Sequence, residues 1–108
     1  MITLEDFDKV ELRVGKVIDA SINKGARHPA YKLKIDFGPL GIKKSSAQIT
    51  DLYKPEDLIN RQVIAVMNFK PIHISEVTSE VRILGAETNE GIVLLNTDKE
   101  VENGSKIS

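Results

Sequence analysis

The sequence contains no cysteine and no tryptophan, and it has only two histidines. Without cysteine the chain can form no disulfide, thiolate nucleophile or cysteine zinc site. His28 and His73 lie far apart in the sequence, and neither has a partner at metal-ligand spacing. We therefore expect no metal ion and no other cofactor.

Long apolar runs and export signals are absent as well. No segment approaches the roughly 18 consecutive apolar residues that a membrane span needs, so we expect no membrane insertion. The opening stretch MITLEDFDKVEL carries acids early and lacks the basic-then-apolar layout of a secretory signal. This pattern favours a cytoplasmic protein.

Catalytic motifs are also missing. The sequence has no nucleophile-elbow motif and no phosphate-cradling glycine loop. Ser79, His73 and Asp51 could be assembled on paper into a triad, but no strained glycine-rich frame surrounds them. We expect no catalytic residues and no enzymatic activity.

The residues that are present indicate one folded domain with an uneven charge distribution. The 108 residues, 41% hydrophobic and 29% charged, suit a single globular domain spanning 1–108. The net charge is −1, yet residues 24–44 hold six basic side chains against one acid, a net charge of +5. This central cationic block is either a solvated face between strands or a surface for an anionic partner such as RNA.

Apolar periodicity predicts an all-β fold. Residues 31–37 alternate cleanly, with Tyr31, Leu33, Ile35 and Phe37 on one face and Lys32, Lys34 and Asp36 on the other. The alternation from Val10 to Ile22 changes phase at Gly15, which predicts a bulge or a sharp bend there. The further strands are predicted over residues 42–50, 62–69, 81–85 and 91–96, with 70–80 irregular, 86–90 a loop and a final turn at Asn103-Gly104.

Two short helices complete the prediction. Thr3 followed by Glu5 and Asp6 indicates a capped helical turn, and Pro55 followed by acids indicates a helix between the third and fourth strands. About five strands with a helix at that place is the arrangement of a five-stranded OB-fold barrel. The middle strands and neighbouring loops of that barrel form a ligand face.

Six segments in order resemble the CsaA family of export-related chaperones, which belongs to a wider tRNA-binding-domain family with an OB fold. That family also includes the C-terminal appendage of methionyl-tRNA synthetases. The likeness runs from about Phe7 to Ile107. The segments are ELRVGKVIDA (11–20), HPAYKLKIDFG (28–38), SSAQITDLYKPEDLI (45–59), QVIAVMNFKP (62–71), TSEVRILGA (78–86) and NGSKI (103–107).

The resemblance implies a non-enzymatic homodimer that binds tRNA and also unfolded or preprotein segments, with the export machinery as a further partner. It implies roles for Lys32 in the HP…KL element, for Asn68 in the NF-x-P element and for the Ser79-Glu80 pair. Arg82 departs from the family pattern, because several tRNA-binding relatives have methionine there. The short N-terminal turn and the C-terminal strands are the expected dimerisation elements.

The strand IKKSSAQIT adds candidates from its own chemistry. Lys44, Ser46 and Gln48 share one face, and lysines attract phosphate while hydroxyl and amide groups make directional hydrogen bonds. The alternative is a sheet edge that lysines protect from aggregation. The predicted RNA-binding residues are Arg27, Lys32, Lys34, Lys43, Lys44, Ser46, Gln48, Asn68, Lys70, Ser79, Glu80 and Arg82. We expect Lys32, Lys34, Lys43 and Lys44 to converge on one positive surface.

Two other functions stay open. In the first, the protein is mainly a polypeptide-binding chaperone, with Met67, Phe69, Ile72 and Ile74 lining an apolar groove. In the second, it is a dedicated tRNA-binding cofactor with no chaperone role. The few aromatic residues are spaced as core positions, so we expect recognition of RNA shape and backbone in place of base stacking.

Overall fold

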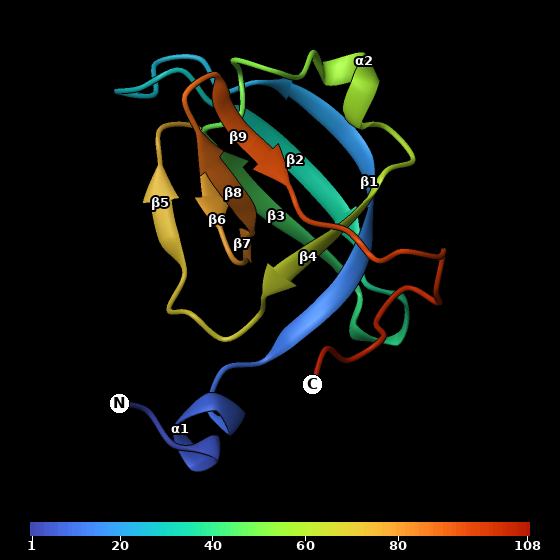
Figure 1. Ribbon diagram of the computed structural model, residues 1–108. Helices are drawn as coiled ribbons and strands as arrows, with labels where there is room; N and C mark the ends of the chain where they lie inside the picture. Colours follow the sequence, from blue (N-terminus) through green and yellow to red (C-terminus); the bar gives the residue numbers. More distant parts are fainter.

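Five antiparallel strands form one strongly curved sheet in the order β3-β2-β1-β4-β7 in this computed structural model, which describes residues 1–108 (Figure 1). The long strand β1 pairs with β2 on one side and with β4 on the other. The short helix α2 lies between β3 and β4 in the chain, as predicted. The elements are α1 (Leu4–Asp8), β1 (Leu12–Ile22), β2 (Tyr31–Asp36), the 3-10 turn Gly38–Leu40, β3 (Ile42–Ala47), α2 (Pro55–Leu58), β4 (Gln62–Val66), β5 (Ile72–Ile74), β6 (Val77–Ser79), β7 (Arg82–Ile83), β8 (Gly85–Thr88) and β9 (Gly91–Leu94).

The free edge of β3 is covered by residues 79–81, which bring the sheet close to a closed barrel. The backbone N–H of Glu80 donates to the carbonyl of Lys44 at 2.8 Å. The fully buried hydroxyl of Ser45 donates to the carbonyl of Val81 at 2.9 Å. The predicted OB-type barrel is therefore confirmed.

The inner face of β2 supplies the centre of the core. Tyr31, Leu33, Ile35 and Phe37 are all buried, as their alternation predicted. They pack with residues of β1, β4 and α2, among them Leu58, which is fully buried. Burying these side chains supplies most of the driving force for folding.

The bulge in β1 lies further along the strand than predicted. The register with β2 shifts between Val17 and Asp19, whereas Gly15 pairs regularly with Val63 of β4. An added Cβ at Gly15 would stand 2.6 Å from Ile35 Cγ2 and from Phe37 Cε1. Gly15 is thus explained by close packing at the barrel wall, and of the two predicted alternatives the bulge at this position was wrong.

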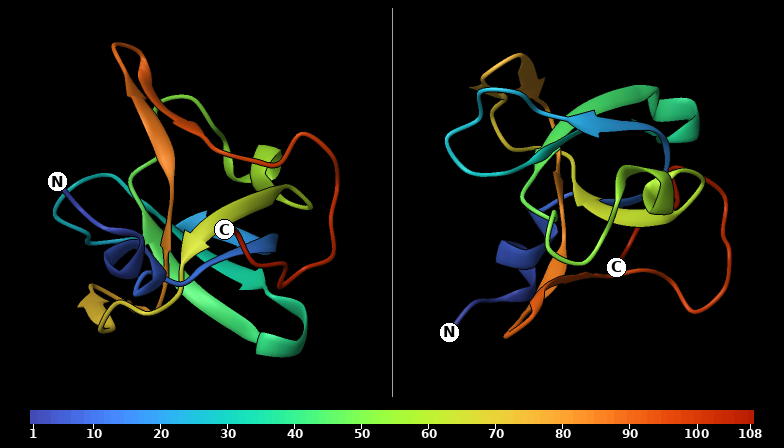
Figure 2. Two further views of the ribbon diagram at one scale, coloured as in Figure 1. Left: turned by 60° about the horizontal axis from the view of Figure 1, so that its bottom comes forward. Right: turned by 90° about the horizontal axis from the view of Figure 1, so that it is seen from above.

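Two hairpins were missed or misplaced by the sequence analysis. The segment expected to be irregular forms the β5–β6 hairpin, and the expected loop over 86–90 is largely the strand β8. Figure 2 shows the β8–β9 hairpin extending away from the barrel. Both hairpins consist of three- or four-residue strands, too short for their period-2 pattern to be recognised. The turn at Asn103-Gly104 is confirmed, with Gly104 at φ +94°.

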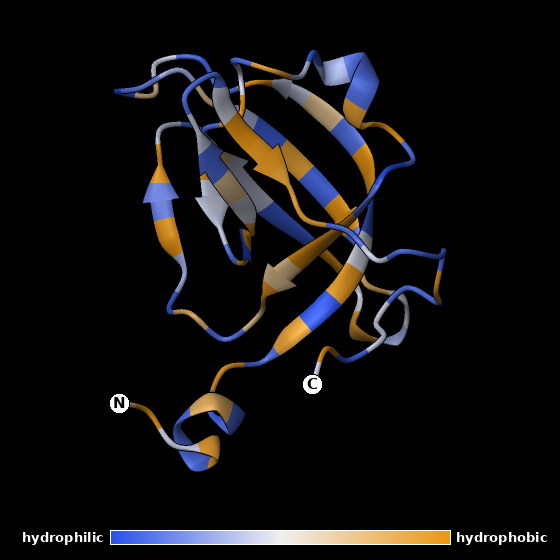
Figure 3. Ribbon diagram, viewed as in Figure 1, coloured by the Kyte–Doolittle hydropathy of each residue, from blue (hydrophilic) through white to orange (hydrophobic).

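Helix α1 begins where it was predicted but contacts the barrel very little. The Thr3 hydroxyl accepts from the Asp6 N–H, and the Asp6 carboxylate accepts from the Thr3 N–H, both at 3.1 Å. The helix buries none of its residues and stands apart from the barrel (Figure 1). Hydrophobic positions occur along it (Figure 3), and Leu4 and Phe7 are exposed. No helix in the structure is both long and apolar enough to cross a membrane.

Candidate nucleic-acid interface

Three lysines from two neighbouring strands line one hollow on the outside of the barrel. Lys34 of β2 lies opposite Lys44 of β3 in the strand register, and Lys32 lies two residues further along β2. All three line the same hollow, whose volume is about 250 Å³. We call Lys32, Lys34 and Lys44 the lysine shelf. Its side chains gather because alternate residues of β2 and β3 point away from the core.

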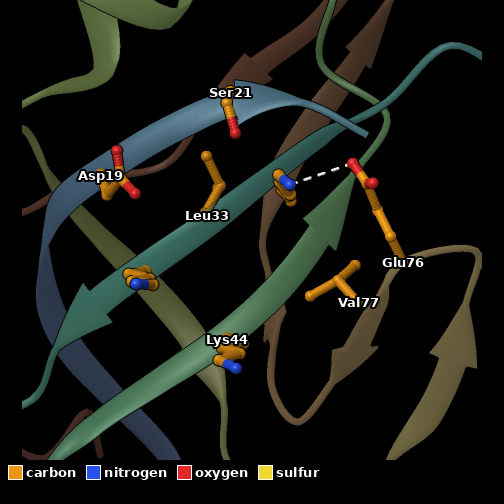
Figure 4. Close-up of a pocket in the computed structure, with 8 residues that line it drawn as sticks. Asp19, Ser21, Leu33, Lys44, Glu76 and Val77 are labelled. Carbon is orange, nitrogen blue, oxygen red and sulfur yellow. Dashed lines mark ion pairs between the residues drawn. The ribbon is translucent and has the colours of Figure 1, made fainter. Parts of the chain in front are cut away.

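The remaining wall of the hollow carries two carboxylates. Asp19 and Ser21 reach it from β1, and Glu76 and Val77 reach it from the β5–β6 hairpin (Figure 4). Asp19 makes no ion pair within 4 Å, whereas Glu76 Oε1 lies 3.0 Å from Lys32 Nζ. The ammonium groups of Lys34 and Lys44 likewise have no carboxylate within 4 Å. Two of the three shelf cations are therefore available to an anionic ligand.

Glu76 is held as a carboxylate by its neighbours. The hydrogen bond from Lys32 and, next, the bond from the Lys24 backbone N–H lower the pKa of Glu76 below its usual value. The group is therefore ionised at neutral pH. Its side chain is 40% exposed and that of Lys32 is 39% exposed, so the pair lies at the surface where solvent weakens it.

The polar character of β3 is largely explained by closure of the barrel. Besides the Ser45 bond to Val81, the Ser46 N–H donates to the Ser79 hydroxyl at 3.1 Å. The Lys44 N–H donates to the Glu80 carboxylate at 3.0 Å. The hydroxyl groups of Ser45 and Ser79 thus complete the hydrogen bonding between β3 and residues 79–81. The Lys44 side chain is exposed.

Ser79, Glu80 and Asn68 are engaged in holding the chain together. The Ser79 hydroxyl and the Glu80 carboxylate accept backbone bonds from β3. The Asn68 amide donates to the carbonyl of Lys9 at 2.7 Å and accepts from the Glu11 N–H at 3.0 Å, which ties the end of β4 to the segment after α1. These residues reached the prediction through the resemblance, and their contacts in the free protein are structural.

The structure does not bring the other predicted cations onto the shelf. Lys43 lies on the face of β3 that carries buried Ser45 and Ala47, so the expected convergence of four lysines was wrong for this residue. Strand alternation separates it from Lys44. Arg27 in the β1–β2 loop, Lys70 after β4 and Arg82 of β7 are exposed and do not line the hollow, and neither does exposed Gln48. Half-buried Ser46 accepts from the Asn23 amide at 3.1 Å.

The two tyrosines are not free to stack on RNA bases. The hydroxyl of buried Tyr31 donates to the carbonyl of Tyr53 at 2.7 Å, and the Tyr53 hydroxyl accepts from the Leu94 N–H at 3.0 Å. The Arg61 guanidinium lies over the Tyr53 ring at 5.2 Å from its centroid. Both tyrosines therefore have structural partners. Phe69, in contrast, is 55% exposed, so the expectation that the aromatic residues occupy core positions was wrong for this residue.

The predicted apolar groove is not one continuous surface. Met67 packs against the core cluster, so its assignment to an exposed groove was wrong. Ile74 is half-buried, and its carbonyl accepts from the Asn23 amide. Phe69 and Ile72, by contrast, are 55% and 60% exposed on the segment that leads into β5. Two of the four apolar side chains are therefore accessible.

Sequence reasoning missed two residues that shape the hollow. Asn23 is 3% exposed, and its amide donates to Ser46 and to the Ile74 carbonyl, which joins β1, β3 and β5. Glu76 neutralises part of the shelf. The sequence signal that could have revealed this hairpin is the polar pair Ser75-Glu76 between the segments IHI and VTS. In the structure these two residues form the turn, with Ser75 at φ +54°.

Comparisons with known proteins agree with this architecture. Residues 12–106 match the family described as "Putative tRNA binding domain". The crystal structure of CsaA from Picrophilus torridus is 51% identical, with a TM-score of 0.94 and coverage of 100% of both chains. The chaperone CsaA from Bacillus anthracis is 50% identical, with a TM-score of 0.93 and coverage of 100% of this chain and 99% of that one.

The match to a longer protein is confined to one part of it. The methionine–tRNA ligase of Pyrococcus furiosus is 36% identical over 106 residues, which are 98% of this chain but only 14% of that ligase. The matched part therefore corresponds to a small portion of the enzyme. On the family match and the two full-length structural matches, the chain belongs to the tRNA binding domain family as a CsaA-like member.

Proposed function

We propose that this protein is a non-enzymatic, CsaA-like chaperone that binds tRNA through the lysine shelf and unfolded polypeptide through a separate apolar surface. The observation that carries the RNA half is the convergence of Lys32, Lys34 and Lys44 on one hollow, with two of them unpaired. Each lysine that meets a phosphate releases counterions, so the binding should weaken steeply as salt rises. The proposal places this activity in the cytoplasm, where folded tRNA and unexported chains are both present.

Filter binding of tRNA over a salt series tests the RNA half. The double variant Lys32→Glu, Lys44→Glu reverses two shelf charges and should abolish binding at low salt. The matched control Lys54→Glu, Lys99→Glu changes the net charge equally at exposed positions outside the hollow and should bind nearly as the wild type does. Salt-insensitive binding, or equal losses in both variants, would refute a role for the shelf.

The polypeptide half is supported by Phe69 and Ile72. Both side chains are more than half exposed, and exposed apolar side chains suit contact with the apolar residues of an unfolded chain. The double variant Phe69→Ser, Ile72→Ser should lose suppression of aggregation while keeping tRNA binding. If the wild type suppresses no aggregation, the alternative function of a dedicated tRNA-binding cofactor takes its place.

Homodimer formation is part of the proposal and is supported by helix α1. A five-residue helix cannot persist in water without packing, yet α1 buries nothing against its own chain. Leu4 is 82% exposed, Ile2 is 76% exposed and Phe7 is 36% exposed. A second copy of this chain would cover these side chains. Light scattering should give twice the 12.0 kDa of one chain.

A further inference from the structure

We propose that Glu76 sets the RNA affinity of the lysine shelf by occupying, in the free protein, the position on Lys32 that an RNA phosphate would take. The inference rests on the proposed function and adds a residue to it. It makes Glu76 a specificity-determining residue: the chain carries its own anionic competitor, and an RNA must exchange with it.

The hairpin that carries Glu76 is pinned in place. The Ser75 hydroxyl donates to the carbonyl of Lys24, and the Lys24 N–H donates to Glu76 Oε1 at 3.3 Å. The amide of buried Asn23 donates to the carbonyl of Ile74 at 3.1 Å. The β5–β6 turn is therefore held against the β1–β2 loop by three hydrogen bonds. These contacts position the Glu76 carboxylate next to Lys32. The contact is built into the fold and is not a chance meeting of two flexible side chains.

A carboxylate and a phosphate offer the same kind of acceptor to an ammonium group. Glu76 Oε1 stands 3.0 Å from Lys32 Nζ, a distance typical of a charge-assisted hydrogen bond. A phosphate that approaches Lys32 must either displace the Glu76 oxygen or bind beside it. In the second case the phosphate and the Glu76 carboxylate repel each other, because both are anions in contact with the same ammonium group. Either route lowers the gain that Lys32 contributes to binding.

The arrangement favours a chain of phosphates over a single phosphate. The ammonium groups of Lys34 and Lys44 have no carboxylate within 4 Å, so an RNA backbone can bind them first and then compete for Lys32. An isolated phosphate at Lys32 gains one lysine and must still face Glu76. Lys32 should therefore discriminate against inorganic phosphate relative to RNA, and removal of the Glu76 charge should weaken this discrimination.

The test compares tRNA binding by the wild type, E76Q and the control E56Q. Glutamine keeps an oxygen that can accept from the Lys24 N–H, and thermal melting checks that the hairpin stays folded. Glu56 is an exposed residue of α2 outside the hollow, so E56Q removes the same charge elsewhere. We expect E76Q to bind about threefold to fivefold more tightly than the wild type at low salt, and E56Q to change affinity less than twofold.

A double-mutant cycle shows whether the gain passes through Lys32. In the K32Q background, E76Q should bring much less improvement, because no ammonium remains to be released. Inorganic phosphate at millimolar concentration should compete with tRNA more effectively on E76Q than on the wild type. E76Q that binds as the wild type does, binds more weakly, or gains equally with and without Lys32 would overturn the inference.

The outcomes separate this inference from the proposed function. If the wild type binds tRNA and E76Q is no tighter, the shelf remains a binding site and Glu76 is not its competitor. If neither protein binds tRNA at low salt, the RNA function itself fails and the inference falls with it. If only E76Q binds, the carboxylate blocks the shelf more strongly than we propose.

Discussion

Gly15 marks the point at which the barrel leaves no room for a side chain, and Gly15→Ala is therefore a sharp test of the packing. An added Cβ would stand 2.6 Å from Ile35 Cγ2, 2.6 Å from Phe37 Cε1 and 2.7 Å from Phe37 Cδ1. Both neighbours are completely buried, so neither can swing outward to relieve the overlap. The strain must instead be absorbed by shifts of β1 against β2.

Overpacking of this kind typically costs 1–3 kcal/mol, and we expect about 2 kcal/mol here because the contact involves three atoms of two immobile side chains. For a domain of this size that corresponds to a fall of about 8 °C in melting temperature. Urea denaturation followed by circular dichroism would give the free energy of unfolding, measured at one protein concentration because dimer formation links stability to concentration.

A second substitution provides the control. Phe37→Leu removes Cε1, so Gly15→Ala should cost less in the Phe37→Leu background than in the wild type. A loss below about 0.5 kcal/mol for Gly15→Ala, or strictly additive losses in the double variant, would refute the steric explanation of this glycine.

Three further predictions concern the interface, the barrel closure and the core. Leu4→Ser with Phe7→Ser should convert the dimer to a single 12.0 kDa species by light scattering, without unfolding the barrel, because neither side chain is buried in its own chain; a persistent dimer would exclude α1 from the contact. Ser45→Ala should cost about 1 kcal/mol in urea unfolding, since a buried hydroxyl loses its bond to the Val81 carbonyl, and an unchanged stability would show that the bond contributes nothing. Leu58→Ala should cost about 2–5 kcal/mol, because the side chain is fully buried, and a smaller loss would mean that α2 packs loosely.

The parts of the fold that follow from local periodicity could be predicted from the sequence. Clean alternation placed Tyr31 and Leu33 inside the barrel, and it placed Lys32 and Lys34 outside. The N-terminal cap at Thr3 and the helix before β4 also followed from short-range chemistry. Each of these features depends on residues within a few positions of one another.

The parts that depend on distant segments could not be predicted in the same way. The need for glycine at position 15 arises from Ile35 and Phe37, some twenty residues away, and a phase change was mistaken for a bulge. The polar residues of β3 suggested a ligand-binding face. The Ser45 hydroxyl instead donates to the carbonyl of Val81, a residue that lies close only in the folded chain. The pairing of Glu76 with Lys32 likewise joins two segments that no spacing rule connects.

The charge pattern of the sequence located the cationic stretch but did not identify which of its lysines lie together. The cationic block from 24 to 44 does contain the shelf, but it also contains Lys43, which alternation turns to the other face of β3. Net charge locates a basic stretch, whereas the register between β2 and β3 decides which lysines can act together.

The central claim is that lysines from neighbouring strands act together on the phosphates of an RNA, and the salt dependence of tRNA binding tests it most directly. The variant Lys34→Gln, Lys44→Gln removes the two unpaired shelf lysines and leaves the Lys32–Glu76 pair in place. The slope of log affinity against log salt should become shallower by about 1.4 to 1.8 relative to the wild type, as expected for the loss of two phosphate contacts. A slope unchanged from that of the wild type would contradict the account.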